Sequence, residues 1–346
     1  MLVLGLFGGG QRMVQNEPGM FIGPIAMVFG YIIDVIFNVI YTITVNHSLG
    51  FSIILLTIIV RALMLPLAAK QQKSMMAMQK LAPEIEKIKK KYPNKDTKSQ
   101  QQMNAEIQKT YSDNKVNPLG GCLPLFIQMP MFFGLSFIMN QSFRYVSRLG
   151  NLYNEISEYL IYQVPGYTNY VVPLALDRVT NRMLENQEIN ISIVSHMSRV
   201  LNVFDVNDWN TLFYQMPDQY VPHLQYLYSQ KVAIENFFGI ALTEAAGMGW
   251  PGILIPVLAV ASALFTSLLT MKTSVATDEK AKMQQRMMMI VMPVMMGVMT
   301  ISMPAGVGIF WITSSVFQIG QQMVLNKKAG IPLPSLSSLF PKKEEA

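Results

Sequence analysis

Charged residues are scarce in this chain. Of its 346 residues only 14% are Asp, Glu, Lys or Arg, while 51% are hydrophobic. Soluble domains carry about 25% charged residues. The composition therefore predicts a polytopic membrane protein.

Residues that build covalent and metal frameworks are also rare. The one cysteine, Cys122, excludes an internal disulfide framework and a four-cysteine zinc site. The three histidines, His47, His196 and His223, are scattered, so no histidine metal cluster is expected. The apolar runs contain no Ser/His/Asp set, carboxylate pair or HExxH motif. We therefore expect neither enzymatic activity nor a bound metal or cofactor.

The N-terminus lacks the features of a cleaved signal peptide. It begins MLVLGLFGGGQRMVQNEPGM, which has no basic n-region and only a short apolar run before the glycines. No cysteine for lipid attachment occurs there. We expect 1–46 to comprise an extracytoplasmic N-terminus and an interfacial amphipathic helix.

The expected interfacial helix is the apolar stretch Met20–Val45. Asp34, Asn38 and Thr42 are spaced four residues apart in it and so share one face of a helix. A polar stripe on an apolar helix is typical of a helix that lies in the membrane interface. The alternative is a spanning helix whose Asp34 pairs with an arginine of the next segment.

Five apolar runs predict an all-α fold with five transmembrane helices. The predicted spans are 47–69, 119–140, 251–271, 286–303 and 304–325. The polar stretch 70–118 predicts a helical hairpin, with helices at about Gln71–Lys91 and Thr97–Asp113 on either side of Tyr92-Pro93-Asn94. The other connections are a long segment of several short helices at 141–250, a short loop at 272–285 and a tail at 326–346.

The distribution of charge predicts the orientation. The hairpin carries eleven lysines against five acidic residues, and the segment Lys272–Arg286 and the tail add four basic residues each. The long segment 141–250 has six basic and ten acidic residues, a net charge of 6 − 10 = −4. Basic connections stay in the cytoplasm. We expect a multi-pass protein of the bacterial plasma membrane with the N-terminus outside and the C-terminus in the cytoplasm.

A single arginine, Arg61, stands in the first predicted span. A guanidinium at the centre of a bilayer costs about 2.5–3.5 kcal/mol on insertion scales, so it usually faces a partner or a water-filled cavity. No acidic residue occurs in the other four predicted spans. This favours a solvated groove around Arg61, and pairing with Asp34 remains the structural alternative.

Polar side chains at similar depth in several predicted spans are candidates for lining such a groove. They are Thr57, Gln128, Thr266, Ser267, Ser314 and Gln318. Each of them alone is more often a helix–helix hydrogen bond. Together they predict a wet cavity.

Three stretches of the chain carry a family likeness. They are TIIVRALMLPL in the first span, NPLGGCLPLFIQMPMFFGL at Asn117–Leu135, and PAGVGIFWITSSVFQIGQQ at Pro304–Gln322. Each resembles a signature segment of the YidC/Oxa/Alb membrane-insertase family, and the second is the most specific. Phe310-Trp311 stands where an aromatic pair is usual, whereas Ser314-Ser315 stands where Ser-Asn is usual and the segment 141–250 is longer than expected.

The resemblance implies a function. It implies a membrane protein insertase and chaperone with a five-helix core, a cytoplasmic helical hairpin and a positively charged hydrophilic groove. The groove is open to the cytoplasm and to lipid, and the family acts alone or with the Sec translocon, without nucleotide. Nascent membrane proteins and the lipid bilayer are the implied partners, the Sec translocon and the ribosome are candidate partners, and DNA is not expected.

The resemblance also assigns roles to residues of this chain. It implies that Arg61 is the groove charge that attracts an acidic substrate tail, with Thr57 among the substrate-contact positions. The implied positions along which a substrate helix slides are Pro124, Met129, Pro130, Phe133 and Trp311.

A transporter or channel that uses Arg61 as an anion or proton site is the competing function. Transporters usually show internal repeats and broken helices at matching positions. No such repeat is found in this sequence, which favours the insertase.

Overall fold

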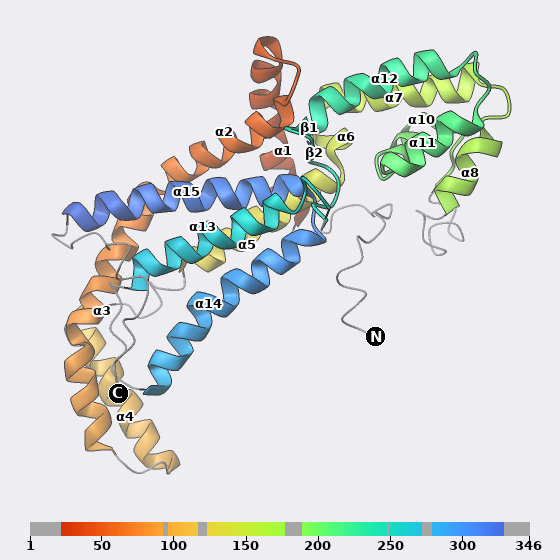
Figure 1. The fold of residues 1–346 in the computed structure, drawn as a ribbon. Helices are drawn as coiled ribbons and strands as arrows, with labels where there is room; N and C mark the ends of the chain where they lie inside the picture. Colours follow the sequence, from red (N-terminus) through yellow and green to blue (C-terminus); the bar gives the residue numbers. More distant parts are fainter. Residues whose placement is uncertain are drawn as a thin grey trace, which may run out of the picture. The chain divides into compact units, whose positions relative to one another are not determined.

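The computed structural model describes residues 22–92, 96–116, 123–176, 189–247, 249–271 and 279–328 (Figure 1). The expected all-α fold is confirmed, because helices make up most of these residues and the strands are two residues long. The predicted turn at Pro93-Asn94, Cys122, and most of the loop and the tail lie outside the described residues.

Fourteen helices lie in the described residues. They are α1 Ile22–Ile43, α2 Ser48–Leu63, α3 Leu65–Lys91, α4 Thr97–Asp113, α5 Leu123–Asn140, α6 Ser142–Tyr145, α7 Ser147–Gln163, α8 Thr168–Leu176, α10 Val194–Leu201, α11 Val206–Gln215, α12 Val221–Glu235, α13 Leu254–Met271, α14 Glu279–Ile301 and α15 Ala305–Lys328. The strands β1, Asn236–Phe237, and β2, Ile240–Ala241, pair antiparallel.

The chain divides into two compact units. The first comprises residues 1–57, 130–257 and 298–311, and the second comprises 58–129, 258–297 and 312–346. Helices α2, α5, α13, α14 and α15 each contribute residues to both units. These five helices overlap the ranges in which the sequence predicts spans, but α14 begins at Glu279, inside the predicted loop 272–285, and α2 ends at Leu63, inside the predicted span 47–69.

One described helix is by itself long and apolar enough to cross a membrane. It is Gly23–Ile43, within α1. A second segment qualifies if α2 and the start of α3 are taken together as one bent span. Shorter apolar helices run over Leu254–Ser267 and Pro293–Ser302.

Helix α1 has one buried and one exposed apolar face, both in the first unit. Ala26, Ile33 and Phe37 are buried at helical spacing, whereas Met27 and Tyr31 are 62% and 74% exposed. Exposed apolar side chains in such number are expected of a helix that contacts lipid or another apolar surface.

The polar stripe of α1 binds the start of α7. Asp34 Oδ1 accepts hydrogen bonds from the backbone N–H of Ser147 at 2.8 Å and from its hydroxyl at 2.9 Å. Asn38 Oδ1 accepts from Nε of Arg148 at 3.1 Å. A carboxylate at a helix N-terminus satisfies free N–H groups and the helix dipole. Asp34 therefore caps α7.

Residues 142–241, between α5 and α13, form an inserted helical domain of the first unit. The several short helices expected there are confirmed, and α6, α10 and α12 pack against α7 (Figure 1). Tyr153, Ile156 and Leu160 of α7 are fully buried, as is Trp209 of α11. The domain thus has a hydrophobic core of its own.

A buried ion pair lies in this domain. Lys231 Nζ is 3.1 Å from Glu235 Oε2, and the two side chains are 4% and 2% exposed. Glu235 also accepts hydrogen bonds from the Thr243 hydroxyl at 2.7 Å and from the Tyr153 hydroxyl at 3.3 Å. The ammonium group lies 5.4 Å from the Tyr228 ring centroid. Burial raises the pKa of Tyr228 to about 12, so this ring stays neutral at physiological pH.

The end of α12 and strand β1 pack on the start of α2. The backbone N–H of His47 donates to the Ala233 carbonyl at 3.0 Å, and Nδ1 of His47 lies 2.7 Å from the Asn236 carbonyl oxygen. The Phe237 ring lies against the backbone of Gly50, where a Cβ would collide with it. The glycine allows this close approach.

The segment after β2 is bonded to the connection between α14 and α15. Ala246 N–H donates to the Met303 carbonyl at 3.1 Å, and Gly306 N–H donates to the Leu242 carbonyl at 2.9 Å. These bonds satisfy polar backbone at the start of α15.

In the second unit, α2 and α3 meet at a bend of 53°. The break falls after Leu63, inside the range 47–69 for which the sequence predicts one span, and Pro66 follows it. Proline has no N–H to bond the carbonyl four residues earlier and fits the first turn of a new helix. Its position accounts for the break.

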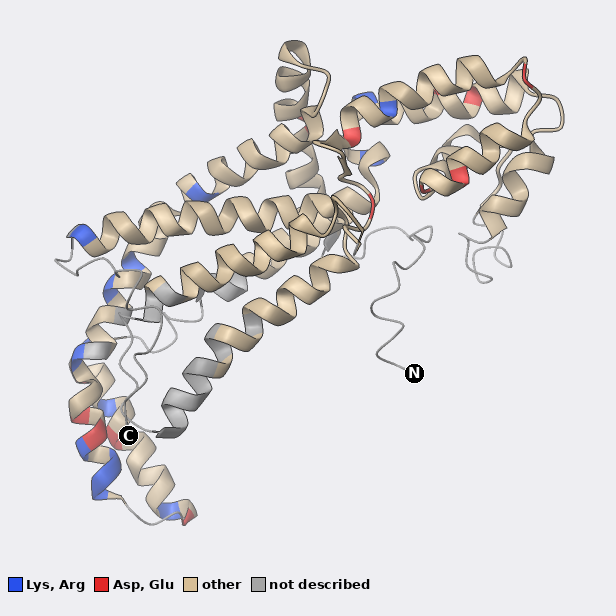
Figure 2. Cartoon of the chain, viewed as in Figure 1, with Lys and Arg blue, Asp and Glu red and all other residues tan. Residues whose placement is uncertain are grey.

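Helices α3 and α4 form the predicted hairpin. Helix α4 occupies the predicted range Thr97–Asp113, and α3 begins at Leu65, six residues before the expected Gln71. Ile85 and Ile88 are buried on the inner face of α3. Lysines and acidic residues gather on this hairpin (Figure 2).

The C-terminal end of α3 is joined to the middle of α4 by one carboxylate. Glu106 accepts from Lys91 Nζ at 3.0 and 3.1 Å and from the Tyr92 hydroxyl at 2.8 Å. The hydrogen bond from Lys91 is the main reason that the pKa of Glu106 lies below its usual value. The same contact raises the pKa of Lys91.

Candidate functional site

The predicted groove arginine is held by two glutamines of the second unit. Nη2 of Arg61 on α2 donates to Oε1 of Gln128 on α5 at 2.9 Å. With the Gln318 amide of α15 oriented so that its oxygen faces the guanidinium, that oxygen accepts from Nη1 at 2.8 Å and from Nη2 at 3.0 Å. The structure thus brings together three of the residues that the sequence proposes for the groove.

No carboxylate of the described residues forms an ion pair with Arg61. Both of its partners are neutral amides, and its Nε is buried without a hydrogen-bond acceptor. A guanidinium has five N–H donors and no acceptor capacity. The two amides therefore orient the group but leave its positive charge uncompensated.

The arrangement follows from local sequence. Arg61 lies in the last turn of α2, just before the break at Pro66, and is partly exposed. Gln128 follows the prolyl residue Pro124 by one turn on α5 and precedes Pro130, which is inside the helix. Each polar side chain is thus the one long hydrogen-bonding group of an otherwise apolar helix segment.

Further polar groups of the predicted lining lie on α13 and α15. The Thr266 hydroxyl donates to the Ser262 carbonyl at 2.9 Å and lies 3.5 Å from the Ser315 carbonyl oxygen. Ser314 is 3% exposed, and its hydroxyl has no hydrogen-bond partner within the described part of the chain. Ser267 is partly exposed.

Thr57 has a different environment. It belongs to the first unit and is 1% exposed, and its hydroxyl donates to the Ile53 carbonyl at 2.6 Å. This bond within α2 satisfies the hydroxyl. A lining role for Thr57 remains a prediction.

The implied sliding positions lie on α5 and α15. Met129 and Phe133 are 38% and 44% exposed, and Pro130 is partly exposed. The Trp311 ring stacks on Phe132, with centroids 5.2 Å apart and an interplanar angle of 21°. Pro124 lies in the first turn of α5.

Phe132 is a residue that the sequence reasoning missed. It is 7% exposed and fixes the Trp311 ring. The adjacent pair Phe132-Phe133 was a signal, because neighbouring residues on a helix point in directions about 100° apart. One phenyl ring can therefore pack inward while the other stays exposed.

Metal binding finds no support among the described residues. No group of three His, Cys, Asp or Glu side chains in them is placed to hold an ion.

Comparison with known proteins shows the family of this chain. A family model, 60Kd inner membrane protein, matches residues 39–330, which is most of the chain. The chain therefore belongs to this family, which is the YidC/Oxa family that its motifs resemble.

Several curated bacterial proteins are similar to it. Membrane protein insertase YidC of Oceanobacillus iheyensis is 25% identical over 287 residues, which cover 82% of this chain and 76% of that protein. YidC of Alkalihalophilus pseudofirmus is 39% identical over 148 residues, 40% of this chain and 55% of that protein. YidC 1 of Lactococcus lactis is 56% identical over 86 residues, 25% of this chain and 32% of that protein. The last two are thus matched over about half and a third of their length.

Proposed function

We propose that this protein is a membrane protein insertase of the inner membrane, and that Arg61 receives the acidic tail of its substrates. The observation that carries the proposal is the guanidinium held by Gln128 and Gln318 with no carboxylate partner in the described residues. Family membership and the names of the similar proteins support the insertase function.

The amides make Arg61 ready to bind an anion. A structural ion pair would neutralise the arginine, and a free side chain would sample many rotamers. Neutral acceptors avoid both outcomes. Hydrogen bonds between a guanidinium and a carboxylate are roughly twice as strong as neutral ones. A substrate carboxylate can therefore replace a glutamine oxygen at Arg61 with a gain in energy.

The strength of the attraction depends on the surroundings. At 4 Å, two unit charges attract by about 1 kcal/mol in water and by about 4 kcal/mol at an effective dielectric constant of about 20. Partial burial of Arg61 puts it in the second regime. The attraction then offsets part of the cost of bringing an acidic tail into the membrane.

A second set of residues concerns the release of the substrate helix into lipid. We propose that the substrate helix slides along Met129, Pro130 and Phe133 of α5 and past Trp311 of α15. The exposed Met129 and Phe133 side chains support this path. Burying the substrate's apolar surface supplies about 0.025 kcal/mol per Å², so no nucleotide is required.

The proposed topology has five spans, α2, α5, α13, α14 and α15, with α1 at the outer interface and the N-terminus outside. The basic hairpin of α3 and α4 then lies in the cytoplasm. There it is a candidate docking site for the ribosome or the Sec translocon.

Reconstitution tests the proposal. Purified protein is placed in liposomes with a small membrane protein that has an acidic external tail, and insertion is read by protease protection. Arg61→Ala should lower insertion about tenfold, which corresponds to about 1.4 kcal/mol of lost attraction. Arg61→Lys should retain much of the activity because it keeps the charge.

Two outcomes would contradict the proposal. One is full insertion of acidic-tailed substrates by Arg61→Ala. The other is a solute flux through the wild-type protein that Arg61→Ala abolishes, since that would indicate a transporter. A substrate whose tail has its acids replaced by amides is the control, and the variant should not affect its insertion.

A further inference from the structure

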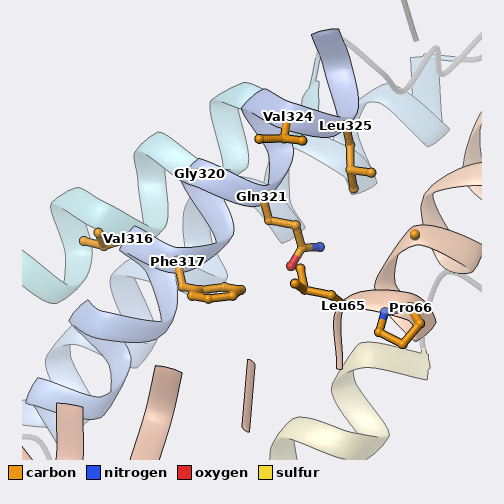
Figure 3. A pocket seen from close by; sticks show the side chains of 9 residues that line it. Leu65, Pro66, Val316, Phe317, Gly320, Gln321, Val324 and Leu325 are labelled. Atoms are coloured by element: carbon orange, nitrogen blue, oxygen red, sulfur yellow. The ribbon is translucent and has the colours of Figure 1, made fainter. Parts of the chain in front are cut away.

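An apolar cavity of about 590 Å³ lies in the second unit, between the first turn of α3 and the last turns of α15 (Figure 3). Its lining residues are Leu65, Pro66, Ala69, Val316, Phe317, Gly320, Gln321, Val324 and Leu325. All but Gln321 are apolar. The volume is typical of a small-molecule site, for which the usual range is about 300–1,000 Å³.

The cavity is open rather than filled by the protein. A Cβ added to Gly320 would meet no atom within 4 Å. Val316, Val324 and Leu65 of its lining are 59%, 56% and 40% exposed. An apolar occupant from outside the chain would cover these side chains.

Lysines continue both helix faces beyond the cavity. Lys70 follows Pro66 by four residues and Lys73 follows Ala69 by four, so each lies one turn further along the same face of α3. On α15, Lys327 follows Val324 by three residues. All three lysines are exposed.

No acidic residue offsets these lysines along the same helices. Helix α15 contains none, and the first of α3 is Glu84, about three turns beyond Lys73. Lysines thus follow the apolar lining on both helices, Lys70 and Lys73 on α3 and Lys327 on α15.

We propose that this cavity binds one acyl chain of an anionic phospholipid, whose phosphate lies at Lys70, Lys73 and Lys327. The shape excludes a substrate helix, because a helix with its side chains is about 10–12 Å across and a single turn would fill the space. The Gln321 amide lines the cavity and can donate to an ester carbonyl of the lipid. Under the proposed topology, the lipid belongs to the cytoplasmic leaflet.

Lipid binding to the purified full-length protein tests this site. The protein in detergent is titrated with phosphatidylglycerol or with phosphatidylcholine of the same chains, and bound lipid is counted by native mass spectrometry. Wild type should bind one phosphatidylglycerol at least about fivefold more tightly than phosphatidylcholine, because each lysine near anionic lipid contributes about fivefold.

Two variants separate the contribution of the acyl chain to lipid binding from that of the lipid headgroup. Gly320→Leu adds an apolar side chain to the cavity lining at a position where a Cβ meets no atom within 4 Å, and it should weaken the binding of both lipids. The combined Lys70→Gln, Lys73→Gln and Lys327→Gln variant should still bind the acyl chain of either lipid but lose the preference for phosphatidylglycerol. Circular dichroism and thermal unfolding check that both variants fold.

Matched controls lie on α15 and on the hairpin of α3 and α4. Met323→Phe adds bulk at an exposed position of α15 outside the cavity lining, and Lys87→Gln, Lys98→Gln and Lys109→Gln remove three exposed lysines of the hairpin. Both should bind lipid as wild type does. Unchanged lipid binding by Gly320→Leu would overturn the proposal, as would equal binding of the two lipids by wild type.

Inorganic phosphate distinguishes a headgroup site from a free-anion site. Millimolar phosphate should not displace the lipid, because the acyl chain of the lipid provides most of the contact. Displacement of the lipid by phosphate would indicate a site for a free anion and not for a lipid. Weaker lipid binding in Gly320→Leu is read without any insertion assay. Failure of the lipid-site proposal can therefore be distinguished from failure of the insertase proposal, which the Arg61 variants test.

Discussion

Gln128 accepts a hydrogen bond from Arg61 at 2.9 Å through a side chain that cannot ionise. The first prediction exploits this. Gln128→Glu keeps the shape and adds a negative charge, so it should pair with Arg61 and compete with the substrate tail. Insertion of acidic-tailed substrates in the liposome assay should fall toward the Arg61→Ala level, about tenfold.

The same change at an exposed glutamine of the hairpin, Gln101→Glu, is the control and should insert normally. Normal insertion by Gln128→Glu would mean that the charge of Arg61 is not used.

The second prediction concerns the alternative role of Arg61 as a counter-ion of Asp34. Asp34 binds Ser147 instead. Asp34→Ala should therefore leave the dependence of insertion on acidic tails unchanged, while the loss of the cap of α7 should lower stability by about 0.5–2 kcal/mol. A defect matching that of Arg61→Ala would restore the ion-pair interpretation.

The third prediction addresses the buried pair Lys231–Glu235. Glu235→Gln leaves a buried ammonium without its carboxylate, and breaking such a pair costs about 3–5 kcal/mol. We expect faster protease cleavage in 142–241 and a lower unfolding temperature. Lys90→Gln, which breaks an exposed pair with Glu86, should change stability by no more than about 1 kcal/mol. Equal effects of the two variants would contradict the buried pair's role.

The fourth prediction tests the contact between β1 and α2. Gly50→Ala places a methyl group against the Phe237 ring, and overpacking typically costs about 1–3 kcal/mol. The unfolding temperature should fall. Gly249→Ala is the matched control, because a Cβ there meets nothing within 4 Å. Identical unfolding curves for the two variants would refute the close contact.

The fifth prediction is a pH dependence of the hairpin. Because the pKa of Glu106 is lowered, its contribution is present above its usual value of 4.5 and is lost as pH falls through the lower folded value. The raised pKa of Lys91 means that its contribution is present below 10.5 and is lost as pH rises through the higher folded value.

Amide hydrogen exchange across α3 and α4 measures this. At neutral pH, Glu106→Gln should exchange faster than wild type near Lys91 and Tyr92. The difference should disappear at a pH below the folded pKa of Glu106. A difference that is independent of pH would show that ionisation of Glu106 is not involved.

Much of this organisation was readable from the amino-acid order. Helix α4 occupies its predicted range because local signals define its ends: Asp96 accepts from Ser99 N–H at its start, and Asn114 caps its end. The all-α class follows from apolar runs and from capping of this kind. Arg61 and its two glutamines could be proposed because each is a conspicuous polar group in an apolar stretch.

Other features required knowledge of the fold. The stacking of Trp311 on Phe132 joins residues 179 positions apart, from 311 − 132. The inserted domain's core depends on such long-range packing, which periodicity does not encode. The bend at Pro66 was also not anticipated, because proline is compatible both with the first turn of a helix and with a buried kink.

For Arg61, the sequence determines one property and the tertiary structure another. The free-energy cost of placing its guanidinium in an apolar helix follows from the sequence. The sequence therefore predicts that Arg61 contacts a polar partner or water. Which partner it received depended on the rotational and axial positions of α5 and α15, and these are set by packing. The fold supplied two neutral amides where a carboxylate would have neutralised the charge.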